Sequence, residues 1–160
     1  SYFCKKDGVD LHMVDTPFAS ITNSAIMAGG DLANDPAINI LDGRNLTLIG
    51  LAGMLGAKIG ATHLALGFHI EPVARPFPDA SPEFFDAAAA LMPLAFKHKM
   101  ELCAPFSQAT REEIFAYARN HDSDILSLAH TCYEDVPGGC GKCSHCLLKQ
   151  QITSAWAPKE

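Results

Sequence analysis

The sequence predicts an α/β fold in which helices flank a parallel sheet, followed by a C-terminal zinc knuckle. Two observations carry this prediction. Short apolar runs with strand character alternate with helical patterns from residue 10 to residue 130, an order typical of parallel sheets. Four of the six cysteines then lie close together between residues 132 and 146. We therefore expect an α/β unit over residues 1–130 and a zinc knuckle with its own helix over residues 131–160.

The composition narrows the class of protein. With 160 residues, of which 48% are hydrophobic and 19% charged, the chain can form one hydrophobic core. The net charge of −6 and the lack of a basic tract argue against nucleic-acid binding. No apolar run approaches the roughly 18 residues of a membrane span. The first ten residues lack the apolar core of a secretory signal, and clustered cysteines suit a reduced compartment, so we expect a cytoplasmic protein.

The first half of the chain is expected to contain two strands and a buried helix. The segment at residues 46–61 is apolar on nearly all sides, which indicates a buried helix. The continuously apolar run at 62–68 indicates a strand covered on both faces. A weak alternation predicts another strand at 10–15, and a helical piece followed by a loop is expected at 18–37.

The second half is expected to continue the alternation. Ser81 can cap a helix that begins at Pro82 and runs to about Lys97, with Pro93 kinking or interrupting it. Thr110 and Glu113 form a capping box at the start of a further helix. A strand is expected at 100–104 and a last helix at 145–156. Parallel sheets bind ligands at the carboxyl ends of their strands, which places the loops 42–45, 68–81 and 105–111 near the site.

The cysteine pattern predicts a zinc site. Cys140, Cys143 and Cys146 form two consecutive C-x-x-C steps, and Cys132 can complete a tetrahedron from across a short loop. Four thiolates without an open position are typical of structural zinc. Three alternatives stay open: a disulfide with two spare thiols, buried free cysteines, and a catalytic zinc in which His130 or His145 replaces a thiolate. Cys4 and Cys103 are not expected to be ligands.

Four stretches of the sequence carry a resemblance to a known family. They are Gly43-Arg44-Asn45; Leu66-Gly67 with Pro78-Asp79 and Pro82-Glu83-Phe84; Thr110-Arg111-Glu112-Glu113-Ile114; and Thr131-Cys132-Tyr133 with the three later cysteines and Leu148. In this order and spacing they resemble the 7-cyano-7-deazaguanine synthases of the ATP-pyrophosphatase superfamily. The likeness covers most of the chain from Asp42 onward.

The resemblance implies a fold, a reaction and a set of site residues. It implies an adenine-nucleotide alpha-hydrolase-like sheet and the ATP-dependent conversion of 7-carboxy-7-deazaguanine and ammonia to the nitrile of queuosine biosynthesis. ATP with Mg²⁺ is then a substrate, and zinc is structural. Arg44 and Arg111 would neutralise the leaving pyrophosphate, with surface ion pairs as their alternative role. Asn45, Asp79 and Glu83 would contact the substrate. Homodimer formation is left open.

The sequence also departs from the family pattern. The phosphate loop Ser-Gly-Gly-x-Asp-Ser is absent from these 160 residues, and Gly29-Gly30-Asp31 does not have the spacing to replace it. His69, Glu71 and Val73 stand where the family has Asn and Asp-Tyr. A polypeptide of these residues alone is therefore expected to bind ATP weakly and to form no detectable nitrile. Two alternatives remain: an adenylating relative with another substrate, and a zinc-stabilised interaction domain without catalysis.

Overall fold

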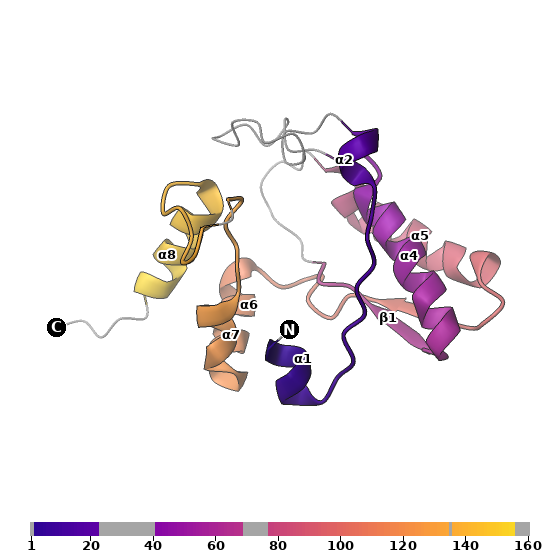
Figure 1. The fold of residues 1–160 in the computed structure, drawn as a ribbon, viewed down its shortest axis with the longest axis horizontal. Helices are drawn as coiled ribbons and strands as arrows, with labels where there is room; N and C mark the ends of the chain where they lie inside the picture. The colour runs from indigo at the N-terminus through magenta and orange to yellow at the C-terminus, as the bar shows by residue number, and fades with distance from the viewer. Residues whose placement is uncertain (1, 23–40, 69–76, 135, 156–160) are drawn as a thin grey trace.

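The computed structural model describes residues 2–22, 41–68, 77–134 and 136–155 (Figure 1). Its core is one parallel strand pair with two covering helices, and further helices form a second group beside it. The elements in chain order are α1 (Tyr2–Asp7), α2 (Phe18–Ile21), α4 (Arg44–Ile59), β1 (His63–Ala65), the 3-10 helix η2 (Pro78–Ala80), α5 (Pro82–Ala95), β2 (Glu101–Cys103), α6 (Arg111–His121), α7 (Ser123–Leu128) and α8 (Ser144–Ser154).

The sheet of the described residues consists of β1 and β2. The strands pair in parallel, with His63 opposite Glu101 and Ala65 opposite Cys103. The connection between them contains α5, as a parallel pair requires a crossover. The predicted parallel α/β arrangement is therefore confirmed, although each strand is shorter than the sequence indicated.

The hydrophobic core lies on one face of this sheet. Ile49 from α4, Ala88 and Met92 from α5, and Met100 form its buried centre. Leu64 and Leu102, which pair with each other, pack against it from the two strands. Because side chains alternate between faces, the neighbours of Leu64 point to the other face, and His63 and Ala65 are exposed. The prediction that residues 62–68 are covered on both faces is wrong for this reason.

Local sequence signals explain where the helices begin. The Ser81 Oγ accepts a hydrogen bond from the Phe84 N–H at 3.0 Å and caps α5. Thr110 and Glu113 form the predicted capping box of α6, with the Glu113 N–H donating to Thr110 Oγ1 at 3.2 Å. Pro93 does not interrupt α5, which continues to Ala95. Proline lacks one backbone N–H of the helix, and α5 ends two residues after Pro93.

A second group of elements contains α6, α7 and α8, on the opposite side of the view in Figure 1 from α4 and α5, and α1 lies between the two groups at the lower edge of the view. Helix α1, which the sequence did not predict, is joined to the α6–α7 junction by charge. Lys6 Nζ lies 2.8 Å from Asp122 Oδ2 and 3.5 Å from Asp124 Oδ2. The pKa of Lys6 is raised and that of Asp122 is lowered, chiefly by their mutual hydrogen bond. These contacts are solvated and contribute little to stability.

The strand predicted at residues 10–15 is not found in the structure. Residues 10–15 form no strand, because no strand of the described residues pairs with them, and Leu11, Met13 and Val14 are exposed. The helical piece expected from residue 18 is the four-residue α2. Residues 23–37 with Gly29-Gly30-Asp31, and the substituted loop with His69, Glu71 and Val73, lie outside the described residues. No described helix combines the length and apolar character that crossing a membrane requires.

Two glycines of α4 provide a matched test of this packing. A Cβ added at Gly53 would lie 2.5 Å from the Phe96 ring, whereas one added at Gly50 would meet nothing within 4 Å. Both changes to alanine gain up to about 1 kcal/mol of helix propensity. Gly53→Ala also overpacks the core, so its free energy of unfolding should fall below that of Gly50→Ala by about 1–3 kcal/mol. Urea unfolding measures the difference, and equal stabilities would contradict the packing of Phe96 on α4.

Candidate metal centre and ligand cavities

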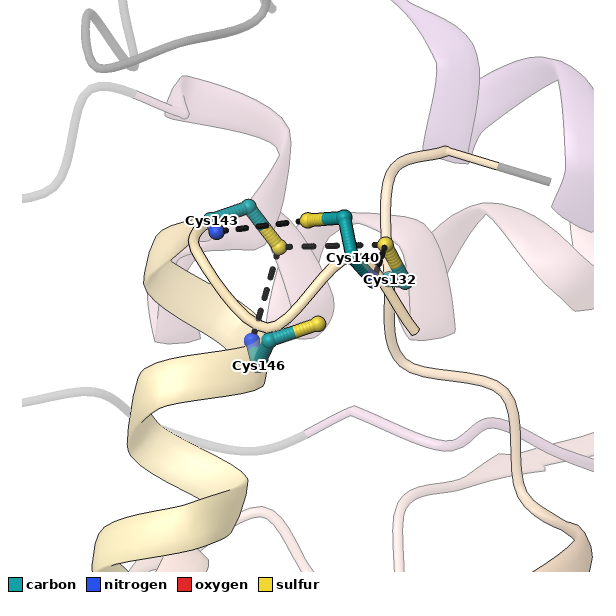
Figure 2. A group of neighbouring side chains, drawn as sticks. All are labelled: Cys132, Cys140, Cys143 and Cys146. Atoms are coloured by element: carbon teal, nitrogen blue, oxygen red, sulfur yellow. Dashed lines mark hydrogen bonds between the residues drawn. The ribbon is translucent and has the colours of Figure 1, made fainter. Parts of the chain in front are cut away.

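Four cysteine side chains meet at one point at the start of α8. The Sγ atoms of Cys132, Cys140, Cys143 and Cys146 all lie within 4.8 Å of one another. Figure 2 shows them converging from the loop after α7 and from the first turn of α8. Within the described parts of the chain, this is the one cluster of cysteine, histidine or acidic residues with the spacing of a metal site. The predicted convergence of these four thiols is confirmed.

Backbone N–H groups are directed at the sulfur atoms. Cys132 Sγ accepts from Cys140 N and from Glu134 N, both at 3.3 Å. Cys140 Sγ accepts from Cys143 N, and Cys143 Sγ accepts from Cys146 N, each at 3.4 Å. Donors of this kind stabilise a negative charge on sulfur, so the loop favours thiolates.

The pKa values of these crowded thiols are shifted in opposite directions. Burial opposes ionisation of Cys143, but hydrogen bonds from the N–H groups of Cys146 and Tyr133 and from the thiols of Cys146 and Cys140 together outweigh it and lower its pKa to about 6. The N–H groups of Lys142 and Cys143 lower the pKa of Cys140. For Cys146, the Gly141 N–H favours the thiolate, yet burial and the neighbouring thiols raise the pKa to about 11. Some of the thiols in the cluster are therefore ionised near neutral pH. Burial and the neighbouring thiols oppose ionisation of Cys146.

One glycine is required for the sulfurs to come together. Gly139 has a φ of +88°, a conformation that residues with a Cβ rarely adopt. A Cβ at this position would also lie 2.9 Å from Cys146 Sγ. The residue therefore allows the turn and leaves room for the fourth sulfur.

The donor set fits a tetrahedral zinc ion. Bonds of about 2.3 Å to four thiolates place neighbouring sulfurs about 3.8 Å apart. Cys143 Sγ and Cys132 Sγ lie 4.0 Å apart here. The two histidines weighed as replacement ligands are held elsewhere: His130 Nε2 is 3.0 Å from Glu134 O, and His145 Nε2 is 2.7 Å from Tyr133 Oη. No disulfide joins the cysteines, all of which are free thiols.

Three of the five other predicted site residues come together at the start of α4. The Asn45 N–H donates to Asp79 Oδ2 at 2.9 Å, and Asn45 Nδ2 donates to Asp79 O at 2.8 Å. Arg44 Nε donates to Asn45 Oδ1 at 3.3 Å. The Asp79 carboxylate thereby accepts one of the N–H groups left unpaired in the first turn of a helix. These bonds fix the loop before α5 against α4.

A cavity of about 320 Å³ opens beside this contact and is called the α4–α5 cavity here. Arg44 and Asn45 line it on one side, and Phe68, Phe84 and Phe85 line it on another. Glu83 is exposed in the first turn of α5 and is not among the residues that line it. The predicted substrate residues are therefore divided, with Asn45 at the cavity and Glu83 outside it.

Arg111 lies at a different cavity, of about 360 Å³, between α6 and α8. This α6–α8 cavity is also lined by Gly67, which lines the α4–α5 cavity as well. Gly67 follows β1 closely, so both cavities adjoin the carboxyl end of that strand, as the loop positions predicted. The two arginines do not meet in one cavity.

Sequence reasoning missed three further residues of the α6–α8 cavity. They are Phe106, His145 and Lys149. His145 lies between two cysteines, so the sequence pattern indicates it only as an alternative metal ligand. Lys149 lies one turn into α8, and no local motif marks it. Only the tertiary placement of α8 near α6 brings these side chains to the cavity that Arg111 lines.

Known proteins resemble this chain over nearly its whole length. The family model described as "Queuosine biosynthesis protein QueC" matches residues 1–156. A 7-cyano-7-deazaguanine synthase of Methanobrevibacter smithii is 24% identical over 163 residues, covering 92% of this chain and 71% of that protein. One from Clostridium acetobutylicum is 26% identical over 159 residues, covering 92% of this chain and 70% of the relative. With a family match over nearly its whole length and four converging cysteines, the chain belongs to the QueC family of queuosine biosynthesis proteins.

Proposed function

We propose that this protein takes part in the ATP-dependent conversion of 7-carboxy-7-deazaguanine and ammonia to 7-cyano-7-deazaguanine. The observation that carries the proposal is the family match over residues 1–156, together with relatives named for this product. We infer that the parallel strand pair is part of an adenine-nucleotide alpha-hydrolase-like sheet, with Mg²⁺ accompanying the ATP. Activation of a carboxylate by ATP releases pyrophosphate, so the reaction needs fixed positive charge near the leaving group.

The predicted residues are assigned to separate tasks. Arg44, held by Asn45, supplies positive charge at the α4–α5 cavity, and Arg111 supplies it at the α6–α8 cavity. Asn45 and Asp79 maintain the wall of the first cavity through their paired hydrogen bonds. Glu83 is exposed, and a contact between it and substrate would be made from outside that cavity.

The four cysteines are assigned to one zinc ion. Their sulfurs have the number and spacing of a closed tetrahedral site, and backbone N–H groups already favour thiolates there. A site closed by four protein ligands leaves no position for substrate, so the metal would order the knuckle rather than take part in the reaction.

The reaction itself is the direct test. The 160-residue chain and the longest form that its gene encodes are incubated with ATP, Mg²⁺, ammonia and 7-carboxy-7-deazaguanine. The longest form should release AMP and yield amide and then nitrile by mass spectrometry. The 160 residues alone should form none, because no Ser-Gly-Gly-x-Asp-Ser loop is present to position the phosphates. A longest form that binds both substrates and yields neither product would contradict the proposal.

If the four cysteines hold one zinc ion, the substitution Cys143→Ala should abolish metal binding. The variant should lose the zinc ion that the parent carries at one per chain. It should also lose at least about 3 kcal/mol of unfolding free energy, because the metal orders these loops. Elemental analysis and urea unfolding in reductant measure the two effects.

Cys103→Ala is the matched control, since this thiol lies in β2 and belongs to no metal cluster. It should retain a full zinc content. Loss of zinc from both variants, or from neither, would refute the assignment.

Metal binding should also release protons. Near neutral pH, Cys143 with a pKa of about 6 is already largely ionised, whereas Cys146 with a pKa of about 11 is protonated. Zinc must displace at least the Cys146 proton, and the affinity should fall further as the pH drops through about 6 and Cys143 also binds a proton. Calorimetric titrations in two buffers of different ionisation enthalpy measure the release. Equal enthalpies in both buffers would show that no proton leaves.

A further inference from the structure

The four cysteines of the knuckle differ in what surrounds their sulfur atoms. We propose that Cys132 and Cys143 are a redox pair, which a hydroperoxide such as hydrogen peroxide converts to a disulfide, and that the knuckle releases its metal ion when this bond forms. The release of metal rests on the proposed zinc assignment, whereas formation of the disulfide does not.

An oxidant can approach the sulfur of Cys132 through a cavity of about 390 Å³ on the knuckle, called the knuckle cavity here. Cys132 and Cys146 line this cavity, whereas Cys140 and Cys143 do not. Cys132 is also partly exposed, and Cys143 is buried. Because hydrogen peroxide is only slightly larger than water, it fits in this space beside Cys132.

The sulfur of Cys132 also has the charge that reaction with a peroxide requires. The thiolate, and not the thiol, is the nucleophile in such a reaction. Cys132 Sγ accepts hydrogen bonds from the N–H groups of Glu134 and Cys140, both at 3.3 Å. These donors stabilise a negative charge on the sulfur. A single cysteine thus combines access from the cavity with an environment that favours the thiolate.

Cys143 is placed to complete the disulfide. Its Sγ lies 4.0 Å from Cys132 Sγ, along a dashed line in Figure 2. A disulfide has an S–S distance of about 2.0 Å, so the two sulfurs must approach each other by about 2 Å. Cys143 is the N-cap residue of α8, and the described residues between it and Cys132 form neither helix nor strand. A shift of this size therefore breaks no helix or strand.

The oxidation takes place in two steps. The Cys132 thiolate attacks one oxygen of hydrogen peroxide, the O–O bond breaks, and hydroxide leaves, so that Cys132 becomes a sulfenic acid. The Cys143 thiolate then attacks the Cys132 sulfur, the S–O bond breaks, a second hydroxide leaves, and the S–S bond forms. Two electrons pass from the two sulfurs to one peroxide, and both hydroxides take protons from solvent.

The disulfide leaves the knuckle with too few ligands for its metal. Only the thiolates of Cys140 and Cys146 remain, whereas a closed zinc site requires four ligands. The affinity for zinc should therefore fall, and the ion should dissociate. Thr131 and His145 lie beside the oxidised residues in the sequence and line the α6–α8 cavity. Oxidation of the knuckle therefore alters one wall of that cavity.

Peroxide treatment of the reduced, zinc-loaded 160-residue chain tests the redox pair. Peptide mapping by mass spectrometry without reductant should find a disulfide between Cys132 and Cys143, and a chelating dye should detect one zinc ion released per chain. Dithiothreitol with added zinc should restore the starting state. A disulfide between another pair of the four cysteines, or release of zinc without any disulfide, would overturn the proposal.

Cys103 is an internal control in the same digest. Its thiol lies in β2 and donates to Leu64 O at 3.7 Å, away from the sulfur cluster. It should stay reduced while Cys132 is oxidised. Loss of the Cys103 thiol at the same rate would show unselective oxidation and would also refute the pair.

Two neighbouring glutamines of α8 test the route of the oxidant. Gln150 lines the knuckle cavity, whereas Gln151 is exposed and does not line it. Gln150→Trp narrows the cavity, so zinc release by tert-butyl hydroperoxide, a bulkier oxidant, should slow at least about threefold. Gln151→Trp should react at the parental rate. Both variants should carry one zinc ion and keep the parental melting temperature. Equal rates of release from the two variants would refute access through this cavity.

The zinc content of the reduced chain separates this proposal from the metal assignment. If the reduced chain carries zinc but peroxide forms no bond between Cys132 and Cys143, the assignment stands and the redox pair is wrong. If the reduced chain carries no zinc and the bond still forms, the assignment fails and the redox pair stands. Neither result depends on whether the longest form makes the nitrile.

Discussion

The C-terminal part of the molecule depends on the approach of four sulfur atoms. Between residues 131 and 155, the only buried apolar residues in the described chain are Cys143 and Ile152, and Leu147 is exposed. Apolar packing is therefore too sparse to order the loop that precedes α8. Burial and the neighbouring thiols raise the pKa of Cys146, so four thiolates at this point would carry charge that the protein alone does not balance. In the proposed zinc site, a divalent cation would neutralise the added charge and order this loop.

The other part of the molecule is held by ordinary packing around one parallel strand pair. Leu64 and Leu102 face the two helices α4 and α5, and the glycines of α4 let Phe96 and Met100 approach its backbone. Gly67, just beyond β1, connects this part to the knuckle because it lines both cavities. Arg44 and Arg111 thus stand at two neighbouring spaces on one edge of the sheet.

Local signals predicted helices better than strands. The caps at Ser81 and Thr110 act over a few residues, so their effect does not depend on the rest of the fold, and both helices begin where expected. A strand exists only where a partner supplies its hydrogen bonds. The alternation at residues 10–15 has no such partner among the described residues, and the run at 62–68 pairs over only His63–Ala65. The short helix α1 carries no strong signal, and its contacts with the rest of the fold include the solvated ion pair between Lys6 and Asp122, 116 residues apart.

The cysteine spacing by itself determined the four converging sulfurs, because short loops bring ligands together whatever the rest of the chain does. The motif order likewise determined the family. Only the tertiary structure decided that Asn45 pairs with Asp79 while Glu83 stays outside, since that depends on how α5 begins against α4. It also decided that Arg111, His145 and Lys149 share one cavity. These residues lie on α6 and α8, far apart in sequence, and the relative placement of two helices is a long-range property that no local pattern encodes.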